Sequence, residues 1–73
     1  MHVELVPVSE ITPYENNPRN NKRAIKSVAQ SLREFGFRQP IVVDEDGVII
    51  VGHTRYAAAL SIGMESVPVH TGS

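Results

Sequence analysis

One long amphipathic stretch is the feature that most limits the folds open to this chain. Between residues 22 and 35, the apolar side chains recur at helical spacing and share a single stripe: Ile25, Val28, Ala29, Leu32 and Phe35. Asn20 or Asn21 supplies an N-cap before this stretch. Gly36 follows it, where helices often end in the left-handed conformation, and Phe37 is placed to pack back on the stripe. The pattern predicts a helix over residues 22–35 with its apolar stripe buried.

The other apolar stretches are shorter, and their order along the chain defines the fold class. They predict a short edge strand ending in proline at 3–8 and a single helical turn at 9–12. Two hairpin strands at 40–44 and 48–51 turn at Asp46-Gly47. A second helix at 53–62 is stopped by Gly63, and a last strand follows at 66–70. Residues 13–21 carry two prolines and four asparagines, so we expect a loop there. The order β-α-β-β-α-β indicates a small single α+β domain.

Composition narrows the class of protein. With 73 residues the chain is expected to be one domain, covering residues 1–73. A domain of this size buries only ~60% of its unfolded surface, so we expect a fragment of a longer protein or a piece that relies on a partner. The absence of cysteine excludes disulfides, zinc-thiolate sites and thiol nucleophiles. Without a long apolar run or a signal peptide, we expect a cytoplasmic protein with no membrane partner.

The β-branched run Ile49-Ile50-Val51 predicts a buried strand. Residues 52–55, Gly-His-Thr-Arg, connect this strand directly to a predicted helix, and we call them the joint. A helix N-terminus is positive and has amide groups without helical partners. Gly52 permits close approach to the backbone, Thr54 adds a hydroxyl donor, and Arg55 adds a planar fork suited to phosphate. The combination is typical of a phosphate site. The alternative is structural, with Gly52 or Thr54 capping the helix, His53 solvated and Arg55 paired with an acid.

Cations gather at the start of the first predicted helix, namely Arg19, Lys22, Arg23 and Lys26. The helix dipole disfavours cations at that end by ~0.3–1 kcal/mol each. An external anion explains their placement, and a nucleic acid bound by Lys22, Arg23 and Lys26 is one such partner; a solvated basic face is the alternative. The net charge of −1 argues against wholesale non-specific DNA binding, but not against such a local patch.

Other groups give weaker signals. Asp44, Glu45 and Asp46 surround an Asp-Gly turn, where acids usually serve the turn itself and not a metal ion. The three histidines lack metal-ligand spacing, and no serine is convincingly paired with a histidine and an acid. The sequence therefore predicts neither a metal site nor a hydrolase triad.

Three blocks in the chain resemble the ParB/sulfiredoxin superfamily. They are "NPR" at residues 17–19, "SLREFGFRQPIVV" at 31–43 and "IIVGHTRYAAALSIGMESVPV" at 49–69. The resemblance covers residues 3–70 and implies a ParB-like N-terminal domain with a nucleotide or phosphate pocket at the joint. It also implies a mixed sheet with two main helices, and the form G-H-T-R looks like the one in ParB-like proteins of phages and mobile elements.

The resemblance also implies roles for individual residues. Gly52 and Arg55 match the family's G-E-R-R block, which wraps a nucleoside triphosphate. The block at 36–40 lines the base and ribose in ParB, so Arg38 and Gln39 are carried over. Arg19 resembles the family arginine near the phosphates. A nucleoside triphosphate with Mg²⁺ is the implied cofactor.

His53 and Thr54 depart from that block, where ParB has glutamate and arginine. The glutamate is tied to nucleotide hydrolysis, so its replacement argues against that chemistry. Sulfiredoxin has its catalytic cysteine where this chain has His53, and its reductase activity is thereby excluded. The third nucleotide block and the helix-turn-helix of ParB would lie beyond Ser73, so further C-terminal domains or a homodimer are expected.

Three functions follow as hypotheses. The first is a binding module that holds a phosphate of a nucleotide or of DNA between Arg19, the basic first turn of the helix at 22–35 and the joint. Gly52, His53, Thr54 and Arg55 lie at its centre, and the module serves partition, transcriptional regulation or DNA modification. The second is a metal-dependent nuclease or phosphotransferase, for which His53 and Glu15 are the candidate catalytic residues. The third is an interaction domain that no longer binds an anion.

Overall fold

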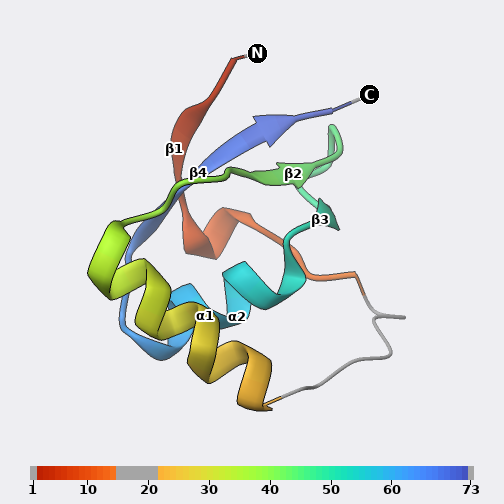
Figure 1. The fold of residues 1–73 in the computed structure, drawn as a ribbon. Coiled ribbons are helices and arrows are strands. Elements are labelled where there is room, and N and C mark those ends of the chain that lie inside the picture. The colour runs from red at the N-terminus through yellow and green to blue at the C-terminus, as the bar shows by residue number, and fades with distance from the viewer. Residues whose placement is uncertain (1, 15–21, 73) are drawn as a thin grey trace.

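The computed structural model describes residues 2–14 and 22–72, in which two helices pack on one face of a four-stranded sheet (Figure 1). The elements are β1 (Glu4–Pro7), the 3-10 turn η1 (Val8–Glu10), α1 (Lys22–Phe35), β2 (Ile41–Val43), β3 (Ile49–Val51), α2 (His53–Ser61) and β4 (Ser66–Thr71). The predicted order and the α+β class are confirmed. Within the described ranges, neither helix is long and apolar enough to cross a membrane.

The sheet is mixed and has the strand order β1-β4-β2-β3. β1 pairs antiparallel with β4, β4 runs parallel to β2, and β2 forms an antiparallel hairpin with β3. β1 therefore occupies an edge, as its terminal proline predicts. At the other edge, the β2–β3 register shifts between Val42 and Val43, which marks a bulge.

Alternate strand residues form the core under the helices. Ile41 and Val67 are fully buried, and they pack in one cluster with Ile11, Val43, Ile49, Ala59 and Val69. The intervening residues Val42 and Pro68 are only half-buried. This alternation gives the sheet one face covered by helices and one face without them.

α1 has the bounds that its apolar pattern predicts, but the stripe is buried less completely than expected. Ala29 is buried and Leu32 packs against the core, whereas Phe35 is 63% exposed. Phe35 is the last helical residue and lies at the edge of the stripe. The chain reverses at Gly36, whose φ is +78°, and Phe37 packs against the core cluster in its place.

α2 ends with two hydrogen bonds of a Schellman motif. The Gly63 amide donates to the Leu60 carbonyl at 3.1 Å, and the Met64 amide donates to the Ala59 carbonyl at 3.0 Å. Ile62 is the C-cap, so the helix is one residue shorter than the predicted range of 53–62. Met64 packs against the core, which confirms its predicted place after Gly63.

The segment after β1 differs from the predicted helical turn at residues 9–12. The 3-10 turn ends at Glu10, Ile11 is extended, and Thr12 forms a parallel bridge with Val48. The Thr12 amide donates to the Gly47 carbonyl and its carbonyl accepts from the Ile49 amide, both at 2.9 Å. Burial of Ile11 and these two bonds stabilise the extended form. The segment thus runs beside β3 toward the joint.

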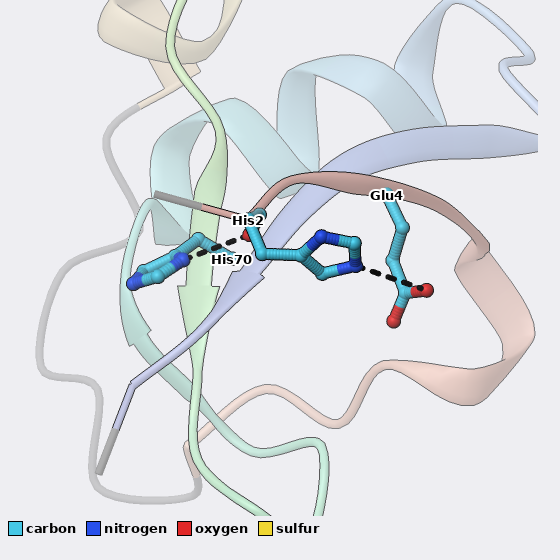
Figure 2. A network of polar contacts seen from close by, with 3 residues as sticks. All are labelled: His2, Glu4 and His70. Atoms are coloured by element: carbon cyan, nitrogen blue, oxygen red, sulfur yellow. Dashed lines mark hydrogen bonds and ion pairs between the residues drawn. The ribbon is translucent and has the colours of Figure 1, made fainter.

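Two histidines lie at the open end of the β1–β4 pair (Figure 2). The His70 Nδ1–H donates to the His2 carbonyl at 2.9 Å, and His2 Nε2 lies 3.9 Å from a Glu4 carboxylate oxygen. The His2 and Glu4 side chains are 86% and 62% exposed, so their ion pair contributes little to stability. These contacts link the residues at the start of β1 to the end of β4.

Candidate functional site

Gly52 lets the chain pass from β3 into α2 without an intervening loop. Its φ is +110°, a conformation that side chains rarely adopt. A Cβ at this position would also lie 3.2 Å from Ile41 Cγ1 and 3.4 Å from Ile41 Cα. The glycine is therefore required by the backbone turn and by the core beneath it, which is a structural reason separate from any ligand.

The first turn of α2 has no side-chain cap. The first helical bond runs from the Tyr56 amide to the Gly52 carbonyl at 2.9 Å. Gly52 has no side chain that could accept a hydrogen bond from the first-turn amides at 53–55. Among the described residues, none accepts a hydrogen bond from the amides of His53, Thr54 or Arg55. Such amides carry the positive end of the helix dipole and suit an anion.

Among the described residues, the side chain that holds Arg55 is an amide and not an acid. Its Nη2 donates to Gln39 Oε1, which comes from the segment before β2. A neutral partner leaves the positive charge of the guanidinium uncompensated, and its other N–H groups can still donate. Thr54 is exposed, and its hydroxyl has no hydrogen-bond partner among the described residues. These two side chains add donors beside the first-turn amides.

His53 connects the joint to the N-terminal segment. The Tyr14 amide donates to His53 Nε2 at 3.3 Å, so Nε2 is the unprotonated ring nitrogen in this arrangement. Thr12, beside β3, brings Tyr14 within reach of this bond. The nitrogen that a general base would use is therefore already engaged.

The joint lines a shallow cleft of about 430 Å³, which we call the joint cleft. It is formed by Val28 of α1, the end of β3 and the whole joint: Val28, Ile50, Val51, Gly52, His53, Thr54 and Arg55. The sequence pattern predicts a buried strand at 49–51, but only Ile49 is buried, and Ile50 and Val51 are each 52% exposed. β3 is a short edge strand that pairs on one side only, so its last residues remain partly exposed. They give the cleft an apolar wall that the sequence analysis missed.

The structure does not bring all predicted site residues together. Gly52, His53, Thr54 and Arg55 share the joint cleft, and Gln39 joins them through Arg55. Arg38 is exposed and lines no part of that cleft. Arg19 and the catalytic candidate Glu15 lie outside the described residues, as do the predicted N-caps Asn20 and Asn21.

The basic residues of α1 face elsewhere. Lys22 and Lys26 line a different groove, between α1 and the end of α2, while exposed Arg23 lines neither hollow. The structure therefore does not bring Lys22 and Lys26 into the joint cleft, where the first hypothesis expected them. Helical spacing explains the result, since Val28 faces the joint from one flank of the buried stripe and Lys22 and Lys26 lie on the other.

The acidic turn between β2 and β3 uses its first carboxylate for the backbone. Asp44 Oδ1 accepts from the Asp46 amide at 2.8 Å and from the Val48 amide at 3.0 Å. The hairpin prediction at Asp46-Gly47 is confirmed by the Gly47 amide, which donates to the Asp44 carbonyl at 3.1 Å. Over residues 2–14 and 22–72, no three acidic or histidine side chains come together as a potential metal site.

Residues 1–72 match the family model described as the ParB N-terminal domain. The ParB-like nuclease domain-containing protein YnaK of Escherichia coli is 39% identical over 64 residues, which cover 86% of this chain and 74% of YnaK. The nucleoid occlusion protein of Bacillus cereus is 38% identical over 90% of this chain, and the chromosome-partitioning protein Spo0J of Thermus thermophilus is 35% identical over 86%. This chain spans about a quarter of the length of each of those two proteins.

Solved structures show the same fold at lower identity. ParB from Caulobacter crescentus, complexed with CTP-gamma-S, superposes with a TM-score of 0.86 and 23% identity over 100% of this chain and 45% of that one. Sulfiredoxin from Arabidopsis thaliana superposes with a TM-score of 0.87 and 23% identity over 100% of this chain and 86% of that one. The fold and the sequence agree, and the chain belongs to the ParB N-terminal domain family.

Proposed function

We propose that this domain binds the phosphate groups of a nucleotide in the joint cleft. The observation that carries the proposal is that backbone amide donors and a guanidinium donor lie at the same cleft. The uncapped first-turn amides of α2 and the guanidinium of Arg55 both belong to residues that line the cleft. Neither donor set has an acidic partner among the described residues. Anion binding at a helix N-terminus is the chemistry that both features favour.

A nucleotide fits the cleft better than a free phosphate does. The exposed side chains of Ile50 and Val51, with Val28 of α1, line the cleft beside the phosphate donors. An apolar wall gains nothing from phosphate, but it can pack against a base or a ribose. The structural likeness to a ParB that was solved with CTP-gamma-S supports this choice.

Each site residue then has a distinct role. Arg55 clamps the phosphates, Gln39 orients its guanidinium, and Thr54 donates its hydroxyl. Arg38 and Arg19 stay predictions for the edge of the site. No carboxylate lines the joint cleft in the described part of the chain, so Mg²⁺ would reach it on the phosphates of the nucleotide.

The proposed setting is a DNA-associated protein. Relatives that include this domain are named for chromosome partitioning and nucleoid occlusion. This chain would supply the nucleotide-binding part of such a protein, within a homodimer or beside C-terminal domains. DNA contact through Lys22, Arg23 and Lys26 stays a prediction, which a titration with duplex DNA tests.

Catalysis is the less favoured alternative. YnaK is named for a ParB-like nuclease domain, which keeps nuclease or phosphotransferase chemistry as a hypothesis. However, His53 Nε2 already accepts the Tyr14 amide hydrogen, so it is not free to act as a general base in this arrangement. Turnover of a labelled nucleotide or DNA with Mg²⁺, lost in Glu15→Gln, would establish an enzyme.

Calorimetric titration of the wild-type chain with CTP, ATP, GTP and tripolyphosphate, each with and without Mg²⁺, tests the proposal. We expect at least one nucleotide to bind more tightly than tripolyphosphate. Loss of a charge-assisted hydrogen bond costs ~1.5–3 kcal/mol, so Arg55→Ala should weaken nucleotide binding about 10–100-fold. Arg33→Ala is the matched control, because Arg33 is an exposed arginine outside the joint cleft. Equal affinity in the two variants would refute the site.

A further inference from the structure

A second hollow, which we call the basic groove, lies between α1 and the C-terminal end of α2. It has a volume of about 560 Å³ and is lined by Lys22, Ile25, Lys26, Ala29, Gln30, Arg33, Ser61 and Ile62. No residue of the described part of the chain lines both this groove and the joint cleft. The nucleotide proposal therefore leaves this groove unexplained.

The groove has an apolar floor and a charged wall. Ala29 is buried and Ile25 and Ile62 are half-buried, so they form the floor, while Lys22, Lys26 and Arg33 are exposed. Among the described residues, no carboxylate lines the groove. None of the three cations forms an ion pair within residues 2–14 and 22–72, although the chain as a whole carries more acidic than basic residues. The groove is thus a local positive surface on a slightly acidic protein.

The spacing of the cations matches a helical partner. Lys22, Lys26 and Arg33 lie on one face of α1, and the eleven helical steps from Lys22 to Arg33 span ~16 Å at ~1.5 Å per step. This is the length of three helical turns. A partner helix lying along α1 would present its own residues at intervals of three and four, the same spacing as the wall.

The floor distinguishes between the possible anions. A phosphate backbone would satisfy the cations, but it has no apolar face to cover the two isoleucines. A helix with one apolar and one acidic face satisfies both parts of the groove at once. We propose that the basic groove docks an acidic amphipathic helix of a partner protein, with apolar side chains on the floor and carboxylates along the wall.

The test uses two 15-residue helical peptides with the same apolar face, one carrying glutamate and the other lysine on both flanks. Fluorescence anisotropy measures their binding to the full chain and to the double variant Lys26→Glu/Arg33→Glu. We expect the glutamate peptide to bind the wild type at least tenfold more tightly than the lysine peptide. The double variant should reverse this preference. Both substituted residues are exposed, and circular dichroism verifies that the variant folds.

Several results would overturn the proposal. They are equal binding of both peptides, binding by neither, or a preference that the double variant leaves unchanged. A 20-base-pair DNA duplex that binds the wild type more tightly than the glutamate peptide, and not the double variant, would assign the groove to nucleic acid. Concentration-dependent dimerisation in sedimentation, lost in the double variant, would assign it to a second copy. Arg55→Ala should bind the peptide normally, which separates this test from that of the nucleotide site.

Discussion

The two ends of β3 carry the polar residues of the chain that most suggest chemistry, and they use them in opposite ways. Before β3, the turn at residues 44–47 presents three acids, and the first of them accepts two backbone amides of its own turn. After β3, the joint at residues 52–55 leaves the first-turn amides of α2 without a side-chain acceptor among the described residues. One end is locally satisfied, and the other is available to a ligand.

The comparison shows that residue type alone does not identify a site. Acids in the turn lower the energy of the hairpin, because a carboxylate replaces water as the acceptor for amides that the turn leaves unpaired. At the joint, Gly52 provides no such acceptor, and the nearest cation is held by a neutral amide. What matters is whether the polar groups are already bonded to their own backbone.

The largest expected effect is on the turn into α2. Gly52→Ala should lower the free energy of unfolding by about 2–5 kcal/mol, combining ~1–2 kcal/mol for a left-handed backbone with ~1–3 kcal/mol for overpacking against Ile41. Gly63→Ala is the matched control, since Gly63 has a φ of +77° but open space around its Cβ position. It should cost about 1–2 kcal/mol. Urea denaturation compares them, and equal losses would show that packing on Ile41 is unimportant.

The next effect concerns the acidic turn. Asp44→Ala removes the acceptor of two backbone amides and should destabilise the chain by about 1–2 kcal/mol, while leaving nucleotide affinity unchanged. Glu45→Ala, an exposed neighbour, should change stability by less than ~0.5 kcal/mol. Denaturation and calorimetry on both variants make the comparison. A loss of nucleotide affinity in Asp44→Ala would contradict the division between the two ends of β3.

A smaller effect is expected at Gln39, which orients Arg55 without contacting the phosphate in our proposal. Gln39→Ala should weaken nucleotide binding by about 3–10-fold, because one side-chain hydrogen bond contributes ~1 kcal/mol. Stability should change little, since Gln39 is exposed. Calorimetry of the single variants and of the double variant with Arg55→Ala checks the coupling. Additive losses would show that the two side chains act independently.

The smallest effect concerns His53. Removing its ring in His53→Ala should increase solvent exchange of the Tyr14 amide by about 2–5-fold, since an exposed hydrogen bond is worth only ~0.5–1 kcal/mol. Thr54→Ala is the neighbouring control and should leave that amide unchanged. Exchange rates measured by NMR test the bond, and unchanged exchange in His53→Ala would show that it does not hold the N-terminal segment.

The sequence was most informative where one local pattern decides the structure. Helical spacing gave the bounds of α1, Gly63 and Met64 gave the end of α2, and Asp46-Gly47 gave the hairpin turn. The joint was recognisable for the same reason, because a β-branched run, one glycine and a helical pattern meet within a few residues. Family resemblance and local physics pointed to one position.

Features that depend on tertiary contacts were not predictable. Nothing local to Ile50 and Val51 shows that these residues stay exposed at the sheet edge, and nothing local to Thr12 predicts its bridge with Val48. Lys22 and Lys26 are separated from the joint because one flank of α1 faces the end of α2 and the other flank faces the joint. Pairing between distant segments decides these features, and a single sequence does not encode it as a pattern.

The most direct test of the central claim is an NMR titration of the isotopically labelled chain with CTP. If the first-turn amides of α2 take the phosphates, the largest shift changes should fall on His53, Thr54 and Arg55, and the amides at 44–47 should not respond. Arg55→Ala should reduce these changes at the same CTP concentration. Largest changes at 44–47 or along α1, or no changes at the joint at saturating CTP, would contradict the account.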